Sequence, residues 1–117
     1  MDLEAAIQKH EAWRMRFHVA MIQHLVMDPT IIAKDNYCEL GKWQYGDAKA
    51  KYGHLDSFAA CVLIHATYHK EAAKVAETIN AKNYIEAENM LCNGSSLANT
   101  SIEVIKAIMK FKEEAKV

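Results

Sequence analysis

The sequence predicts an all-α protein, an antiparallel helical bundle of the four-helix-bundle type with a short extra helix. One proline and four glycines among 117 residues leave long stretches in which nothing interrupts a helix. Apolar residues in these stretches recur at steps of three, four and seven, which places them on one helix face. The connections are short, which favours antiparallel neighbours around one core. We therefore expect residues 1–117 to form a single domain, which is long enough to bury a core.

The first predicted helix covers residues 2–27. Its apolar stripe consists of Leu3, Ile7, His10, Phe17, Met21 and His24. Asp28-Pro29 should end this helix, because proline disfavours the helical conformation in the residue before it. Pro29 can start a short turn with Asp28 as N-cap. Residues 30–53 are predicted to be irregular except for a short helix around residues 36–45, which carries Cys38.

The next helix is expected to begin with Asp56 or Ser57 as its cap and to run to about Asn80. Its stripe is Phe58, Cys61, Val62, His65, Tyr68, His69, Ala72, Ala76 and Ile79. Asn83, with Glu86 three residues later, resembles a capping box and should start the last helix. Near-helical apolar spacing continues across Gly94, so we favour one long helix that is kinked there. A break at Gly94 is the alternative.

Composition excludes several classes of protein. The net charge is -1 and acidic residues interleave with the lysines, so no basic surface for nucleic acid is predicted. No apolar run approaches the ~20 residues that span a membrane, and the acidic start does not resemble a signal peptide. Three cysteines, an odd number, argue against a disulfide framework and favour a reducing cytoplasm.

Four side chains have the chemistry of zinc ligands. His65 and His69 are four residues apart on one helix face, about 5–6 Å between Cβ atoms, so both imidazoles can reach one ion. His10 lies on the core stripe of the first helix, and Cys38 comes from the linker. Three imidazoles and one thiolate would fill a tetrahedral zinc site. Cys61, one turn before His65, is a competing ligand.

The other histidines and Cys92 have simpler interpretations. His24 lies ~20 Å along the helix axis from His10, at 1.5 Å per residue, and His18 points away from that stripe. Both are expected at interior or boundary positions, whereas His54 is expected in a loop. Cys92 is expected in the core. The alternative for His65 and His69 themselves is that they are core histidines bonded to carbonyls or carboxylates, in a helical interaction module without metal.

Three motifs in order resemble the chemoreceptor zinc-binding (CZB) domain of bacteria. They are H-x-x-W from His10 to Trp13, C-x-L-G-x-W from Cys38 to Trp43, and H-x-x-x-H from His65 to His69. The resemblance covers essentially the whole chain. It implies a cytoplasmic helical domain that binds one Zn²⁺ through His10, Cys38, His65 and His69.

The resemblance also implies a sensory role. Such domains are usually attached to chemotaxis receptors or diguanylate cyclases, whose output they control, and they are commonly homodimers. No output domain is recognisable in this chain, so it is either a stand-alone member or a piece of a longer protein. Two signals are compatible with the site: zinc itself, or an oxidant that attacks the zinc-bound Cys38. An enzyme is not expected, because catalytic zinc keeps an open position and four candidate ligands leave none.

Overall fold

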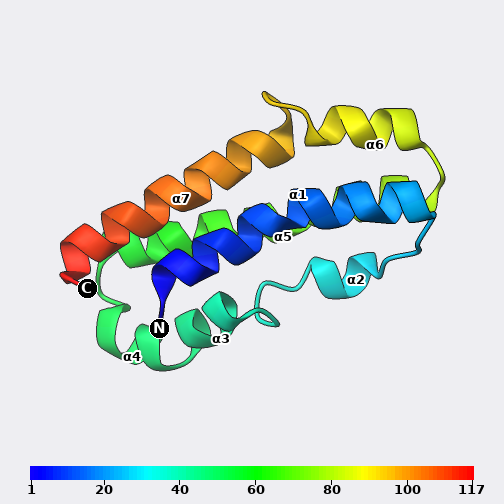
Figure 1. The fold of residues 1–117 in the computed structure, drawn as a ribbon. Helices are drawn as coiled ribbons and strands as arrows, with labels where there is room; N and C mark the ends of the chain where they lie inside the picture. The colour runs from blue at the N-terminus through cyan, green and yellow to red at the C-terminus, as the bar shows by residue number, and fades with distance from the viewer.

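The computed structural model describes residues 1–117 and contains seven helices and no strand. They are α1 (Leu3–Gln23), α2 (Pro29–Ile32), α3 (Glu39–Tyr45), α4 (Asp47–Tyr52), α5 (Asp56–Asn80), α6 (Tyr84–Leu91) and α7 (Ser96–Ala115). The long helices α1, α5 and α7 lie side by side, with α2, α3 and α4 along one flank (Figure 1). α5 is the central element, since it packs against α1, α2, α3, α6 and α7. Its contact with α7 is the most extensive. The predicted all-α helical bundle is confirmed.

α1 is shorter than the predicted helix over residues 2–27. The Asp2 side chain accepts a hydrogen bond from the Ala5 N–H and caps the N-terminus. The helix ends at Gln23 because His24 adopts a left-handed conformation, with φ 55°, and its N–H bonds back to the Ala20 and Met21 carbonyls. Asp28 then caps α2 with Pro29 at the first position, as the sequence predicted. His24 is exposed, so its expected interior or boundary position is wrong.

Residues 30–53 contain more helix than predicted. The expected short helix exists as α3, but α2 precedes it and α4 follows it directly after Gly46. α3 lies against the bundle through Leu40, which is 1% exposed. Gly41 allows this packing, because a Cβ at that position would lie 1.5 Å from the Asp35 carbonyl oxygen. The glycine is therefore required by a close backbone approach.

α5 begins after Leu55, which occupies the N-cap position without a side-chain hydrogen bond. The predicted cap at Asp56 or Ser57 is therefore wrong by one position. Asp56 lies in the first turn, where its negative charge favours the helix N-terminus through the helix dipole. The Ser57 hydroxyl is buried and has no hydrogen-bond partner in the protein.

The favoured single helix after Asn83 is also wrong. α6 starts with Asn83 as its N-cap, as predicted, but ends at Leu91, and α7 starts at Ser96. Gly94 adopts φ 85°, which an α-helix does not contain, and the Ser95 hydroxyl accepts a hydrogen bond from the Ala98 N–H. α6 and α7 run one after the other back along α5, with this break between them (Figure 1).

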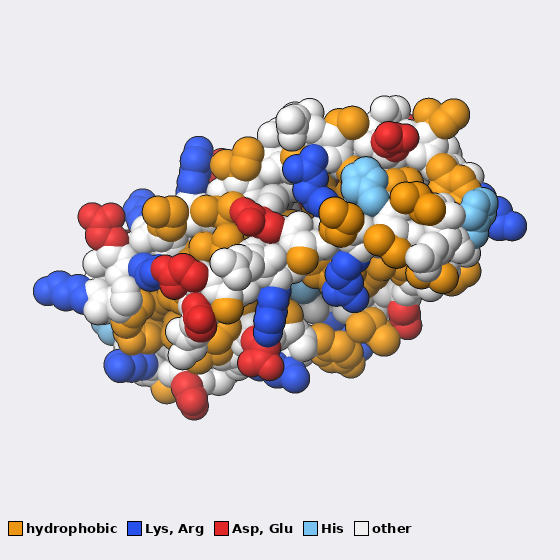
Figure 2. All heavy atoms as spheres, in the orientation of Figure 1, with side chains coloured by type: hydrophobic (Ala, Val, Ile, Leu, Met, Phe, Trp, Pro, Cys, Tyr) orange, Lys and Arg blue, Asp and Glu red, His pale blue; other side chains and the backbone are white.

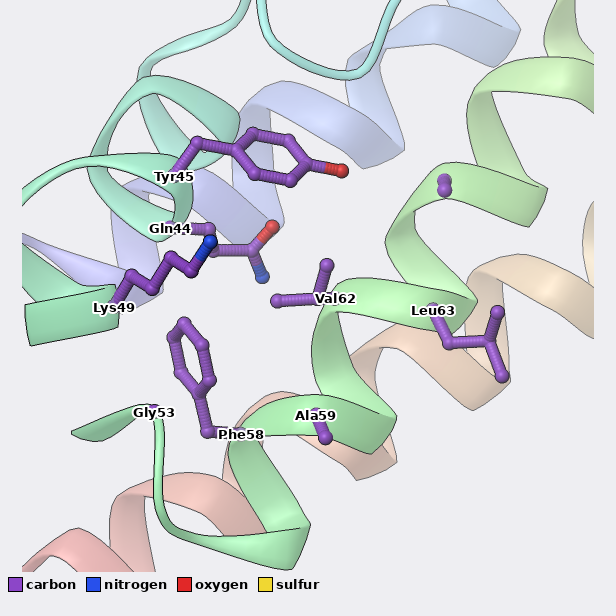
Figure 3. Close-up of a pocket in the computed structure, with 9 residues that line it drawn as sticks. Gln44, Tyr45, Lys49, Gly53, Phe58, Ala59, Val62 and Leu63 are labelled. Carbon is purple, nitrogen blue, oxygen red and sulfur yellow. The ribbon is translucent and has the colours of Figure 1, made fainter.

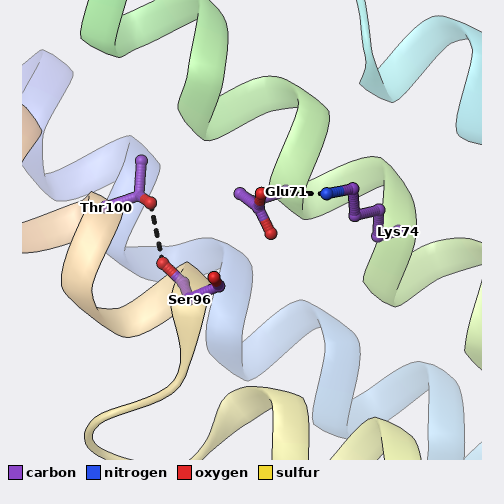
Figure 4. Close-up of polar contacts among 4 residues, drawn as sticks. All are labelled: Glu71, Lys74, Ser96 and Thr100. Atoms are coloured by element: carbon purple, nitrogen blue, oxygen red, sulfur yellow. Dashed lines mark hydrogen bonds and ion pairs between the residues drawn. The ribbon is translucent and has the colours of Figure 1, made fainter.

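Local polar contacts lie within α7 and within α5 where the beginning of α7 is beside α5. Thr100 Oγ1 donates to the Ser96 carbonyl at 2.7 Å, and Glu71 pairs with Lys74 at 3.1 Å on the adjacent stretch of α5 (Figure 4).

Cys92, in the turn that precedes α7, is exposed. Its expected core position is therefore wrong, because the helix that would have buried it ends at Leu91.

The core lies where α1, α5 and α7 meet. Its largest fully buried side chains include Phe17, Tyr68, Phe111 and Ile108. Ala72, Ala73 and Ala76 give α5 a smooth face that neighbouring helices can approach closely. None of the helices combines the length and the apolar character needed to cross a membrane.

Candidate metal centre

Four side chains converge inside the bundle from three separate elements. His10 comes from α1, Cys38 from the N-cap of α3, and His65 and His69 from successive turns of α5. Each offers one donor atom, and the four atoms all lie within 4.8 Å of one another. These are the four residues that the sequence predicted, so the structure brings the entire predicted ligand set together.

Each imidazole is oriented by a hydrogen bond at Nδ1. His10 Nδ1 donates to the Ala6 carbonyl at 2.7 Å, and His69 Nδ1 donates to the Ile32 carbonyl at 2.9 Å. His65 Nδ1 faces Gln44 Oε1 at 3.0 Å. Because carbonyl oxygens only accept, Nδ1 carries the proton in each ring. In the neutral imidazole Nε2 then has a free lone pair, which is the form that binds a metal.

The three Nε2 atoms point at one another and at the Cys38 sulfur. His65 Nε2 lies 3.0 Å from Nε2 of His10 and 3.0 Å from Nε2 of His69. Cys38 Sγ lies 3.8, 3.3 and 3.6 Å from Nε2 of His10, His65 and His69. Three lone pairs therefore face one centre, and the single thiol proton can satisfy only one of them. A cation at that centre would remove the electrostatic repulsion between the lone pairs that the thiol proton does not satisfy.

Burial keeps the histidines neutral. His65 is fully buried, and His10 and His69 are 5% and 4% exposed. Burial lowers the pKa of His65 to about 2, with further lowering by the neighbouring His10 and His69. Burial likewise lowers the pKa of His10 and of His69. The apolar surroundings thus hold all three imidazoles in the metal-binding protonation state.

Cys38 is half-buried, and it is the N-cap residue of α3. The Gly41 N–H donates to Cys38 Sγ at 3.4 Å, so the sulfur serves as the N-cap acceptor of α3. Burial raises the pKa of the Cys38 thiol, and backbone N–H groups at Gly41 and Leu40 oppose this rise. A bound metal ion would stabilise the thiolate directly, since coordination deprotonates a thiol.

Gln44 orients His65, a role that the sequence did not predict. It lies on α3, is 1% exposed, and connects His65 to Cys61, because its Nε2 donates to the Cys61 sulfur at 3.5 Å. Cys61 is therefore a partner of Gln44 and is not part of the four-residue cluster. Nothing in the sequence signals this role. In contrast, the Ala6 carbonyl that orients His10 is one helical turn before it and follows from helix geometry.

Tyr68 supports the same region from α5. Its hydroxyl donates to the His10 carbonyl at 2.6 Å, and its ring packs edge-on against the His10 ring.

The remaining histidines lie outside the cluster. His18 is on a different side of α1, His24 bonds to the Tyr84 hydroxyl, and His54 is in the exposed turn before α5. The loop position predicted for His54 is confirmed.

Two open cavities border the cluster. A pocket of about 790 Å³ lies between α5 and the α3–α4 segment, and Gln44 forms part of its wall beside Tyr45, Lys49 and Phe58 (Figure 3). A second cleft of about 360 Å³, between α1 and the segment before α3, is lined by both His10 and Cys38. Solvent therefore approaches the cluster from the Cys38 side, whereas His65 is enclosed.

Comparisons of this chain with protein-family models, with curated proteins and with solved structures gave no match.

Proposed function

We propose that this protein is a zinc-binding sensory domain that holds one Zn²⁺ through His10, Cys38, His65 and His69. The observation that supports this most strongly is the inward orientation of three deprotonated Nε2 atoms and one sulfur, with every Nδ1 bonded outward. A metal-free core would provide a hydrogen-bond donor for each buried Nε2 atom, whereas here the single Cys38 thiol proton can satisfy only one of the three.

The spacing of the donor atoms fits zinc. Tetrahedral bonds of about 2.0–2.1 Å to nitrogen and 2.3 Å to sulfur separate two nitrogens by about 3.3–3.4 Å, and a nitrogen from a sulfur by about 3.6 Å. Here His65 Nε2 lies 3.0 Å from each of the other two Nε2 atoms, the sulfur lies 3.3–3.8 Å from all three, and the four donor atoms lie within 4.8 Å of one another. Imidazole and thiolate together suit zinc, whereas Mg²⁺ and Ca²⁺ prefer the carboxylate oxygens that this cluster lacks.

A regulatory role fits this donor set better than hydrolysis. Four protein ligands leave no open coordination position for a water molecule, which catalytic zinc requires. Coordination would connect α1, α3 and α5, and metal-binding free energy would become ordering energy for the α3 segment. In keeping with the resemblance to chemoreceptor zinc-binding domains, we propose that this ordering controls an attached or partner signalling protein, such as a chemotaxis receptor or a diguanylate cyclase.

The decisive test is the metal content of protein purified without added zinc, measured by inductively coupled plasma mass spectrometry. We expect about one zinc per chain, and loss of that zinc in His69→Ala. His54→Ala is the matched control, because His54 is exposed and outside the cluster. Absence of metal from the wild-type protein, even after zinc is supplied, would refute the proposal.

Cys38→Ala examines the contribution of the thiolate. It should weaken zinc binding in a competition titration while the far-ultraviolet circular dichroism stays that of a helical bundle, because Cys38 lies outside the three long helices. Cys92→Ala, which removes an exposed cysteine, should bind zinc normally. Equal affinity of wild type and Cys38→Ala would exclude the thiolate as a ligand.

Oxidant sensing through Cys38 is the second candidate function, and the cleft beside His10 and Cys38 favours it, because a small oxidant can reach the sulfur there. Hypochlorous acid would oxidise the Cys38 thiolate to a sulfenic acid and be reduced to chloride, which would weaken the metal site. In a Cys92→Ser background, mass spectrometry after mild treatment should find Cys38 modified before Cys61, which is 2% exposed. Equal modification of both cysteines would remove the basis for this function.

A further inference from the structure

The pocket of about 790 Å³ between α5 and the α3–α4 segment joins an apolar wall to two hydrogen-bond donors. Phe58 is 6% exposed and Val62 is half-buried, whereas Leu63 is 71% exposed, so the apolar wall runs from the interior to the surface. Figure 3 shows Gln44 and Lys49 reaching towards this wall from α3 and α4. Concave sites of about 300–1,000 Å³ with an apolar lining and a few polar groups are typical of small-molecule binding.

Lys49 brings a positive charge to the pocket, and no carboxylate of the chain pairs with it. Tyr45, which also lines the pocket, donates its hydroxyl to the Asp35 carboxylate at 2.5 Å, so that carboxylate is engaged by another donor. On the face that carries α1 and α7, in contrast, Figure 2 shows basic and acidic side chains intermixed, and a charged ligand would meet both signs there. The Lys49 ammonium carries three donors, which an anionic ligand in the pocket can use.

The side-chain amide of Gln44 is the second donor. Its oxygen accepts from His65 Nδ1, and its nitrogen donates one of two protons to the Cys61 sulfur. The other N–H has no acceptor within the chain, although Gln44 is only 1% exposed and forms part of the pocket wall. A buried N–H without an acceptor is unfavourable. The pocket therefore favours a ligand that accepts a hydrogen bond at this position.

We propose that this pocket binds a small monocarboxylate with an apolar body. The carboxylate lies between the Lys49 ammonium and the free Gln44 N–H, and the body packs on Phe58 and Val62. Charge complementarity selects this ligand, because hydrogen bonds to a charged group are about twice as strong as those between neutral groups. A single ammonium balances one negative charge, which favours a carboxylate over a phosphate monoester with its charge of about -2. An aromatic body suits the wall, since it can pack edge-on against the Phe58 ring.

Gln44 connects this pocket to the candidate metal centre, and this link rests on the proposed zinc site. A carboxylate that accepts the free N–H would polarise the amide and make its oxygen a stronger acceptor for His65 Nδ1–H. A stronger acceptor raises the basicity of the His65 Nε2 that faces the metal. We therefore expect the carboxylate to tighten zinc binding by about 5-fold, and zinc to tighten carboxylate binding by the same factor.

Isothermal titration calorimetry of the full chain with phenylacetate and with octanoate tests the pocket and distinguishes an aromatic from an aliphatic body. We expect a Kd of about 1 mM or tighter for at least one carboxylate, and binding of uncharged phenylacetamide that is weaker by about 10-fold. Lys49→Met, which removes the charge, and Ala59→Trp, which fills the pocket, should each abolish carboxylate binding. Lys51→Met and Ala60→Trp are the matched controls, because both positions are exposed and outside the pocket. Failure of both carboxylates to bind, or unchanged binding in both pocket variants, would overturn the proposal.

Gln44→Glu separates the pocket from the metal centre. The glutamate keeps an acceptor for His65 and should retain zinc, but it removes the amide donor and places a negative charge beside the ligand, so carboxylate binding should be lost. Each titration is made with chelator-treated and with zinc-loaded protein. Carboxylate binding to the chelator-treated chain does not depend on the zinc site, whereas equal affinity in the two states of a zinc-binding protein would overturn the link through Gln44. A change in sedimentation mass of Ala59→Trp, without binding of either carboxylate, would identify a contact between copies and overturn the proposal.

Discussion

At the scale of single residues, the candidate metal centre depends on the groups that orient its imidazoles as much as on the ligands themselves. The carbonyls of Ala6 and Ile32 and the side chain of Gln44 each fix one imidazole through Nδ1. Such partners select the tautomer and raise the basicity of the ligand nitrogen. Two of the three belong to the backbone, so Gln44 is the only orienting group that a substitution can remove.

Replacing Gln44 therefore tests directly whether the hydrogen bond to His65 Nδ1 contributes to metal binding. Gln44→Leu leaves His65 Nδ1–H without an acceptor in a buried site, and the zinc affinity should fall by about 10–100-fold. Gln44→Glu keeps an acceptor oxygen at the same position and should retain most of the affinity. Competition titration with a zinc-sensitive dye measures both. If Gln44→Leu bound zinc as tightly as the wild type, Gln44 would have no role in positioning His65.

At the scale of elements, α3 delivers the sulfur ligand because it is anchored next to the bundle. Leu40 is buried, and the Trp43 ring packs edge-on against Phe111 of α7 with ring centroids 5.8 Å apart. Gly41 lies against the backbone of Asp35, three residues before Cys38. The position of Cys38 thus depends on packing at both ends of a seven-residue helix.

Gly41→Ala should displace this element. The added Cβ would meet the Asp35 carbonyl oxygen at 1.5 Å, a backbone atom that cannot move without shifting the segment before Cys38. We expect a loss of about 1–3 kcal/mol in the free energy of unfolding, together with weaker zinc binding. Urea denaturation and zinc titration check the two effects. Gly94→Asn is the control, because nothing lies within 4 Å of a Cβ there and asparagine tolerates its φ of 85°.

At the scale of the whole molecule, three buried imidazoles make the stability of the metal-free fold depend on pH. Burial lowers the pKa of His65 to about 2, and it lowers the pKa of His10 and His69 below their usual value of 6.5. Below about pH 6.5 the unfolded chain therefore binds more protons than the folded chain. The free energy of unfolding must then decrease as the pH falls.

Urea unfolding of chelator-treated protein between pH 7.5 and pH 5 measures this dependence. Each histidine that stays neutral in the fold contributes a slope of about 1.4 kcal/mol per pH unit once the unfolded form is protonated. His65→Leu should reduce the slope, whereas His54→Leu should leave it unchanged, because His54 is exposed. A pH-independent unfolding midpoint would contradict the burial of neutral histidines.

The sequence alone predicted the all-α class, the extent of the central helix and the four residues of the candidate site. The helix depends on local periodicity, since the three- and four-residue spacing of apolar side chains already identifies the buried face of α5 and places His65 beside His69. His10 and Cys38 were predicted from their donor chemistry and from the motif resemblance. The N-caps at Asp28 and Asn83 were also readable, because a side chain that caps a helix acts within three residues of its own position.

Other features depend on contacts between distant segments and are visible only in the folded structure. The break between α6 and α7 follows from the packing of α7 along α5, while apolar spacing alone continued across Gly94. The close approach of Gly41 to Asp35 and the bond from Gln44 to His65 arise only when α3 lies on the bundle. Periodicity reports which face of a helix is apolar, but only the assembled molecule shows that α5 and the α3–α4 segment form a pocket between them.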